Sequence, residues 1–162
     1  MGIVSFFKEA GQKLFGPKEA DGPGDAADKQ ARVTSANEKA GKAIEAYIAS
    51  QKLDAAGLKV EFDGTTSTVT VSGQAEDMAT KERIVLCCGN VRGVHAVNDL
   101  MTVAQSTQAS RFYTVVSGDT LSGIAKGQYG KANAYMKIFE ANKPMLSDPD
   151  KIYPGQLLRI PA

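Results

Sequence analysis

The middle of the chain begins with a helical pattern of apolar residues and continues with two alternating patterns. Over residues 39–53, apolar side chains recur every three or four positions, which predicts a helix with one apolar face. The stretches LKVEF (58–62) and STVTVSG (67–73) alternate apolar and polar residues and are rich in β-branched side chains, which predicts two strands. Asp63-Gly64 between them is typical of a hairpin turn. The helix is therefore expected to lead into a β-hairpin.

Helical spacing returns over residues 75–91 and then gives way to alternation. The apolar positions of this second predicted helix are Met78, Ile84, Val85 and Cys88. Gly89-Asn90 is a typical helix end. The stretch GVHAVNDLMTV (93–103) alternates and predicts a third strand. Residues 31–103 thus predict one small domain in the order helix, strand, strand, helix, strand.

A second small domain is predicted after the polar linker AQSTQASR (104–111), which carries no large apolar residue. Its elements are a strand, two helices and a strand: FYTVV (112–116), LSGIAKGQY (121–129), ANAYMKIFEANK (132–143) and QLLRIP (156–161). Asp119 or Thr120 is suited to cap the first of these helices, and Pro161 is expected at the edge of the last strand. Residues 112–162 therefore predict a β-α-α-β domain, and the two domains together place the chain in the α+β class.

Residues 1–15 predict a short amphipathic helix. Its apolar side chains recur with helical spacing beside polar ones: Phe6, Phe7, Ala10, Leu14 and Phe15. A helix this short is marginal alone, so we expect it to dock on the rest of the protein. Attachment to a membrane surface is the alternative, which the lack of a basic surplus on the polar face disfavours. Residues 16–30, rich in Gly, Pro and charge, predict a flexible connection.

Composition and charge narrow the classes of function. The 162 residues include 19 basic and 18 acidic ones, and a net charge of +1 gives no bulk attraction to nucleic acid. No apolar run is long enough to cross a bilayer. The apolar residues from Ile3 to Phe7 are too few for a secretory signal, and Phe6 stands where myristoylation requires Ser or Thr. We therefore expect a cytoplasmic protein that is a monomer.

Residues that usually carry catalysis or bind transition metals are scarce. The neighbouring Cys87 and Cys88 point in different directions on a helix, so we expect two small buried apolar side chains and no disulfide between them. His95 is the only histidine, and there is no CxxC or HExxH motif, which argues against a zinc site. Nucleophile elbows and phosphate-binding loops are also absent. The sequence predicts a binding protein and not an enzyme.

Residues 112–161 resemble the LysM family. The resemblance is carried by YTVVSGDTLSGIA, the Tyr129-Gly130 pair, IFEANK and IYPGQLLRIP, in this order. It implies a two-stranded antiparallel sheet with two helices on one side, and a groove for glycans that contain N-acetylglucosamine. The groove residues that the resemblance implies are Gly118, Asp119, Thr120, Leu121, Ile152 and Tyr153. Residues of these types are equally suited to turns, a helix cap and a small core.

Residues 30–104 resemble the BON family, through Gly73 after the hairpin and the run GNVRGVHAVNDLMTV. With the opening MGIVSFFKEAGQKLF and the LysM-like ending, the whole chain is similar to bacterial cytoplasmic potassium-binding proteins in which a BON domain precedes a LysM domain. This resemblance implies a potassium ion as the ligand and a role as a potassium sensor or buffer. The alternative function is that of a peptidoglycan- or glycan-binding adaptor that acts through the LysM groove.

A potassium site leaves almost no side-chain pattern, because neutral backbone carbonyls replace the water around this large ion. The last carbonyls of a helix lack partners within it and carry the negative end of the helix dipole. CCGNVRGV is such a helix end, so we expect carbonyls of Gly89, Val91 and Val94 to join those of Phe7 and Ala10 around one ion. Binding is expected to make the protein more compact and to extend to larger alkali cations. The alternative is an ordinary helix end followed by a strand.

Overall fold

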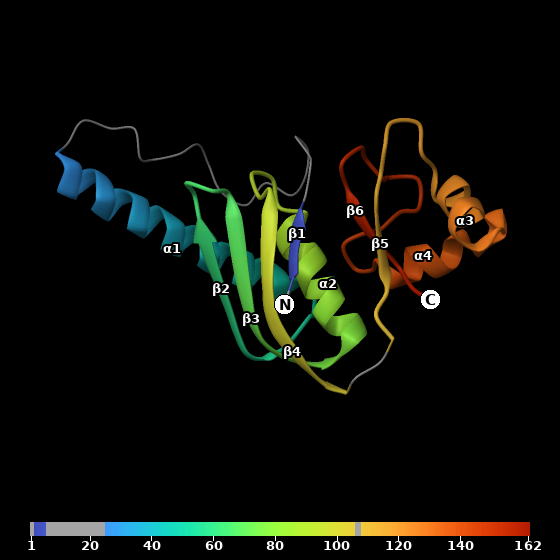
Figure 1. The fold of residues 1–162 in the computed structure, drawn as a ribbon, viewed down its shortest axis with the longest axis horizontal. Coiled ribbons are helices and arrows are strands. Elements are labelled where there is room, and N and C mark those ends of the chain that lie inside the picture. The colour runs from blue at the N-terminus through green and yellow to red at the C-terminus, as the bar shows by residue number, and fades with distance from the viewer. Residues whose placement is uncertain (1, 6–24, 106–107) are drawn as a thin grey trace.

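The computed structural model describes residues 2–5, 25–105 and 108–162, which form two small units side by side (Figure 1). The first unit contains β1 (Gly2–Ser5), α1 (Ala26–Ser50), β2 (Ala56–Asp63), β3 (Thr68–Asp77), α2 (Met78–Gly89) and β4 (Ala96–Gln105). The second contains β5 (Arg111–Thr114), α3 (Leu121–Tyr129), the 3-10 turn η2 (Ala132–Ala134), α4 (Tyr135–Ala141) and β6 (Leu157–Ile160). The α+β fold with two small domains agrees with the prediction.

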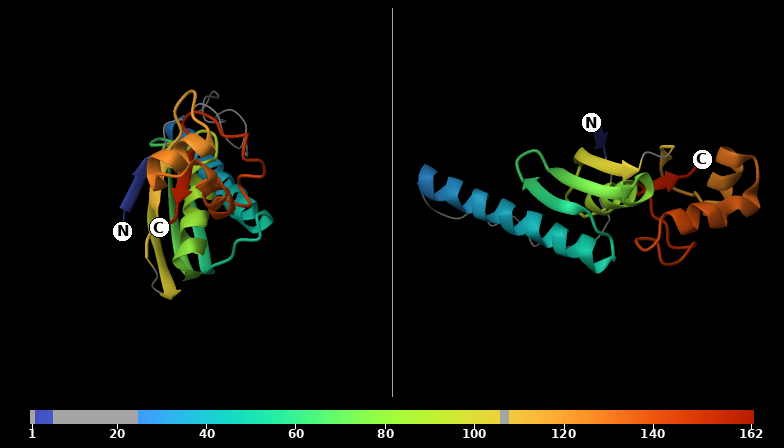
Figure 2. Two further views of the ribbon diagram at one scale, coloured as in Figure 1. Left: turned by 90° about the vertical axis from the view of Figure 1, so that its right-hand side faces the viewer. Right: turned by 90° about the horizontal axis from the view of Figure 1, so that it is seen from below.

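The first unit is a four-stranded sheet with α1 and α2 packed on one face. The strand order is β1-β4-β3-β2; β2 and β3 form the predicted antiparallel hairpin, β3 and β4 are parallel, and β1 is antiparallel to β4. Helix α2 supplies the crossover that a parallel pair requires. Figure 2 shows the N-terminal half of α1 extending past the sheet. Within the described ranges, no helix is long and apolar enough to span a membrane.

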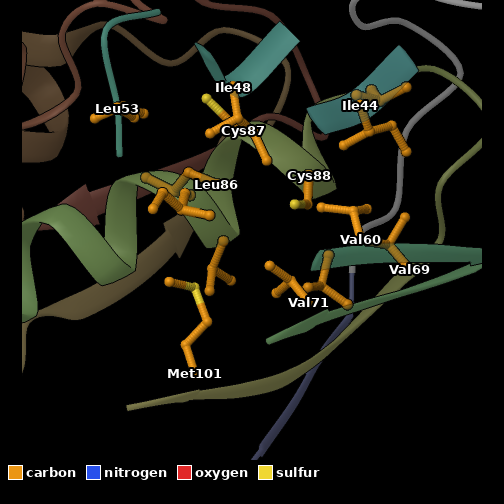
Figure 3. Packing of buried hydrophobic residues seen from close by; sticks show 14 of the residues in the cluster. Ile44, Ile48, Leu53, Val60, Val69, Val71, Leu86, Cys87, Cys88 and Met101 are labelled. Carbon is orange, nitrogen blue, oxygen red and sulfur yellow. The ribbon is translucent and has the colours of Figure 1, made fainter. Parts of the chain in front are cut away.

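The apolar faces of the helices and strands meet in one core. Ile44 and Ile48 of α1 and Val71 of β3 have no exposed surface, and Figure 3 shows them converging with the cysteines of α2. Fully burying an aliphatic side chain of this size stabilises a fold by roughly 1.5–3 kcal/mol. Cys87 and Cys88 are buried in the same core and are not joined in a disulfide, as predicted.

The start of the chain differs from the expectation. Gly2–Ser5 are not the beginning of a helix but form strand β1, which ends with Ser5 opposite Ala96 of β4. The exposed edge of a sheet offers backbone hydrogen bonds to a neighbouring segment, whereas a helix of about fifteen residues is marginal by itself. The rest of the predicted helix, with Phe7 and Ala10, lies outside the described residues.

Helix α1 begins earlier than its apolar pattern indicates. The carboxylate of Asp25 accepts a hydrogen bond from Asp28 N–H at 2.8 Å and caps the helix, so the end of the expected flexible segment 16–30 is helical. Residues 26–38 are mostly exposed and therefore need no apolar stripe. Strand β4 likewise continues to Gln105, into the segment expected to be a linker.

The second unit has the β-α-α-β arrangement that its LysM resemblance implies. Strands β5 and β6 are antiparallel and pack with α3 and α4 around a second core. Thr120 caps α3, its hydroxyl accepting a hydrogen bond from Gly123 N–H at 3.1 Å. Asp119 instead accepts hydrogen bonds from the Tyr113 hydroxyl and from Val116 N–H, both at 2.9 Å. Of the two predicted caps, Thr120 and not Asp119 is therefore the cap of α3.

Candidate cation site

Residues 89–94, which run from the last residue of α2 toward β4, are the predicted position of a cation site and are named here the 89–94 turn. Val94 N–H donates a hydrogen bond to the carbonyl of Val91 at 3.2 Å and closes the turn. Directly after it, His95 N–H donates to the carbonyl of Ser67 at 2.8 Å, which fastens the chain to the end of the β2–β3 connection. Gly89, Val91 and Val94, whose carbonyls are the predicted ligands, thus lie in one short, hydrogen-bonded segment.

The path of the turn depends on Gly93. Its φ of +90° is a conformation that residues with a side chain rarely adopt. Gly89 is the last residue of α2 and is followed by Asn90 as C-cap with a φ of −84°, in agreement with the predicted helix end. The helix ends in an ordinary way, and the reversal occurs at Gly93.

Apolar side chains shield both ends of the turn from water. Val91 and Val94 have no exposed surface and belong to the same core as Cys88. Arg92 and Gly93, at the tip, are exposed. The backbone of the turn is thus anchored in the core on both sides and open to solvent at its tip.

Apart from the side-chain oxygen of Asn90, the oxygen atoms of the turn are main-chain carbonyls. Across residues 25–105 and 108–162, no group of three or more His, Cys, Asp or Glu side chains is placed to hold a metal ion. Burial raises the pKa of Cys87 to about 12 and the pKa of Cys88 well above its ordinary value, so both thiols stay protonated and are poor ligands. The carbonyl of Val91 accepts one hydrogen bond and keeps a second lone pair. The negative end of the α2 dipole adds to the attraction for a cation.

Strand β1 brings the N-terminal part of the chain to this turn. Ser5 pairs with Ala96, which is only the second residue after Val94. Phe7 and Ala10, the other predicted contributors, follow Ser5 closely in sequence and lie outside the described residues. The chain therefore leaves β1 beside the turn.

Asn90, which the sequence analysis did not single out, connects the turn to the second unit. Its side chain is buried, and Nδ2 donates a hydrogen bond to the carbonyl of Leu157 in β6 at 3.3 Å. Leu157 itself packs in the core of the first unit. In the sequence, Glu82, Leu86 and Asn90 follow one another at intervals of four residues, which places them on one side of α2 and its C-cap. This spacing could have indicated a shared face, but a face with one acidic, one apolar and one amide side chain is not a recognisable interface pattern.

Charged side chains in the first half of α2 also fasten this helix to the second unit. The buried carboxylate of Glu82 accepts hydrogen bonds from Arg159 Nε in β6 and from Ser110 N–H, the latter at 2.8 Å. Arg83 donates to the carbonyls of the last two residues of α4 at 3.2 and 3.3 Å. A cation at that helix end also interacts favourably with the dipole of α4. The two units thus pack on each other through α2, next to the 89–94 turn (Figure 1).

The residues predicted to line a glycan groove have different surroundings. Backbone hydrogen bonds of Val115 with Gly155 and Gln156, at 2.7 and 2.8 Å, do bring the two groove loops together. Of the predicted residues, Gly118 and Thr120 are exposed and Asp119 is half-buried. Leu121 belongs to the core of the second unit, Ile152 is partly buried against that core, and Tyr153 lines a cavity beside α1. The alternative assignment of these residues to a small core thus holds for Leu121.

Comparison with known proteins agrees with this arrangement of two domains. The BON domain family matches residues 35–105, and the LysM domain family matches residues 113–161. The chain is 44% identical over 161 residues, or 99% of each chain, to an Escherichia coli protein named Potassium binding protein Kbp. A 50-residue match at 53% identity covers 31% of this chain and 19% of an uncharacterized protein of Deinococcus radiodurans. The chain therefore belongs to the family of Escherichia coli Kbp, in which a BON domain is followed by a LysM domain.

Proposed function

We propose that this protein binds one potassium ion at the 89–94 turn, through carbonyls of Gly89, Val91 and Val94 together with those of Phe7 and Ala10. The observation that carries the proposal is the turn itself, a helix end with buried valines on both sides and β1 ending beside it. The relative that is 44% identical over nearly its whole length is named a potassium-binding protein, which supports the choice of ion.

The chemistry of the turn favours a large monovalent cation. Potassium is weakly hydrated, so neutral carbonyl oxygens are able to replace its water, whereas small divalent ions require carboxylates or retain their water. The turn itself contributes no carboxylate side chain. Its backbone is held by Val94 N–H and by the core packing of the two valines, so the carbonyls resist closing onto a smaller ion such as sodium. Rubidium is expected to bind as potassium does.

The N-terminal segment is within reach of the turn. Two residues of chain span at most about 7 Å, so the covalent connection keeps Phe7 near Ser5 and thus near the start of β4. Ala10 has a longer reach, up to roughly 18 Å from Ser5. Chain connectivity therefore permits both carbonyls to join those of the turn around one ion.

Binding is expected to favour the compact arrangement of the two domains. An ion shifts a conformational equilibrium only toward the form that binds it better. The carbonyls of the turn sit on a segment that Asn90 ties to β6, so an ion that orders the turn also favours the contact with the LysM domain. We infer that the protein acts in the cytoplasm as a potassium sensor or buffer and performs no catalysis.

Glycan binding through the LysM groove has weaker support. Leu121 is almost fully buried, and Tyr153 lines the cavity beside α1. Both belong to the predicted groove, in which apolar side chains would contact a sugar ring. We therefore place potassium binding ahead of the role as a glycan-binding adaptor.

The test is thermal unfolding of the whole protein in chlorides of potassium, rubidium, sodium and lithium at equal ionic strength. A ligand that binds only the folded state at 100 times its dissociation constant adds about 2.7 kcal/mol to the free energy of unfolding. We expect a higher midpoint in potassium and rubidium than in sodium and lithium. Equal midpoints in all four salts would refute potassium binding.

Two glycine variants locate the ion. Gly93, with a φ of +90°, lies in the turn, and Gly118, with a φ of +91°, lies in an exposed loop of the LysM domain. Substitution by Ala strains both backbones in the same way, so Gly93→Ala and Gly118→Ala form a matched pair. Only Gly93→Ala should reduce the midpoint difference between potassium and sodium. The same difference in both variants would mean that the ion binds elsewhere.

A further inference from the structure

A cavity of about 300 Å³ lies where the BON and LysM domains meet. Tyr47 of α1 and Asn90 at the end of α2 form the wall on the side of the BON domain. The chain between α4 and β6 forms the opposite wall, with Met145, Ser147, Lys151 and Tyr153. Ligand sites are frequent at domain boundaries, where two surfaces enclose a space that neither encloses alone.

Two tyrosines, Tyr47 and Tyr153, line this cavity, and their hydroxyls have hydrogen-bonding capacity that the described residues do not use. In the described part of the chain, no group is hydrogen-bonded to the hydroxyl of Tyr47 or to that of Tyr153. Burial raises the pKa of both phenols to about 12, so both remain protonated and able to donate near neutral pH. The cavity therefore presents two O–H donors to an acceptor.

The charge at the cavity favours an anion. Lys151 lines it, and no carboxylate in the described part of the chain does. The Lys151 ammonium is 4.0 Å from Asp148, and their side chains are 77% and 41% exposed. A pair this long and exposed contributes little, so the ammonium group is able to turn toward a ligand.

We propose that the cavity binds a small organic anion whose carboxylate or phosphate group accepts hydrogen bonds from Tyr47 and Tyr153 and pairs with Lys151. The apolar part of the ligand contacts Met145. The volume is at the lower end of the roughly 300–1,000 Å³ that ligand pockets have, so it suits a small molecule. This site is separate from the carbonyls proposed for potassium, although Asn90 belongs to both surroundings.

The probes are benzoate for the carboxylate class and phenylphosphonate for the phosphate class, with neutral benzamide as a control of similar shape. Each is titrated into the full-length ¹⁵N-labelled protein in sodium chloride, so that the result does not depend on potassium binding. We expect saturable chemical-shift changes at the cavity residues with at least one anion. Benzamide should bind about tenfold more weakly, since it lacks the charge that pairs with Lys151.

Conservative variants show whether the phenols are the donors. The double variant Tyr47→Phe/Tyr153→Phe keeps both rings and removes both hydroxyls, and it should weaken anion binding at least about tenfold. The matched control, Tyr135→Phe, alters a half-buried tyrosine of α4 that packs on the LysM core, and should leave affinity unchanged. The proposal is overturned by any of three results: no saturable shifts with either anion, equal affinity for benzamide, or unchanged affinity in the double variant.

Discussion

The carboxylate of Glu82 is expected to contribute more to stability than any exposed carboxylate of this protein. It lies in α2 and receives hydrogen bonds from Arg159 of β6 and Ser110 N–H, which belong to the other side of the domain interface. The side chains of Glu82 and Arg159 are only 6% and 11% exposed. We predict that Glu82→Ala destabilises the whole protein by loosening this interface.

The size of the effect follows from the unpaired charge of Arg159 that the substitution leaves in the interface. Removing one partner of a buried pair strands the other charge without compensation, which destabilises by about 3–5 kcal/mol. Replacing both partners by apolar residues avoids this penalty. The double variant Glu82→Leu/Arg159→Met should therefore lose much less stability than the sum of the two single substitutions.

The assay is urea unfolding followed by circular dichroism, with Glu140→Ala as control. Glu140 pairs with Lys143 at 2.6 Å, but their side chains are 57% and 43% exposed, so its removal should lower the free energy of unfolding by no more than about 1 kcal/mol. Similar losses for Glu82→Ala and Glu140→Ala would refute the reasoning. So would strictly additive losses in the Glu82 and Arg159 variants.

Two further predictions concern α2. Asp77→Ala should lower the free energy of unfolding by about 1 kcal/mol, because Asp77 caps α2 by accepting a hydrogen bond from Thr80 N–H at 2.7 Å. That bond lowers the pKa of Asp77 in the folded state, so its stabilising effect is complete above the unfolded pKa of about 3.9 and is lost as the pH falls through the folded pKa. A wild-type advantage that persists at about pH 1 would contradict this account. Cys87 and Cys88, buried and with raised pKa values, should react with a thiol reagent only when the protein unfolds. Rapid labelling in native buffer would show that α2 opens.

The types and order of the elements between residues 39 and 160 follow from local sequence patterns. Alternation in β2 and β3, helical spacing in α2, and the turn signal at Asp63 each depend on residues that are near neighbours in the chain. Dependence on near neighbours also explains which predictions were wrong. The start of α1 is exposed and therefore has no apolar stripe that a sequence pattern could reveal. Gly2–Ser5 form a strand because the edge of β4 is available for pairing, and a pattern of four residues contains no information about that edge.

The candidate cation site also has a part that the sequence predicted and a part that only the structure showed. The sequence determined that Gly89, Val91 and Val94 fall at one helix end, and the structure places them in one turn. Their role as ligands, with Phe7 and Ala10, remains a proposal. Asn90 and the face of α2 that includes it became evident only in three dimensions.

What the sequence by itself determined is the order of the elements between residues 39 and 160, the two domain families and the glycine-containing turn, because each is set by short-range periodicity or a local motif. What only the tertiary structure decided is how the domains join. Asn90 meets Leu157 across 67 residues of chain, and Glu82 meets Arg159 across 77. Such contacts depend on the packing of whole elements, in which a mixed polar and apolar face becomes an interface only when its partner is in place.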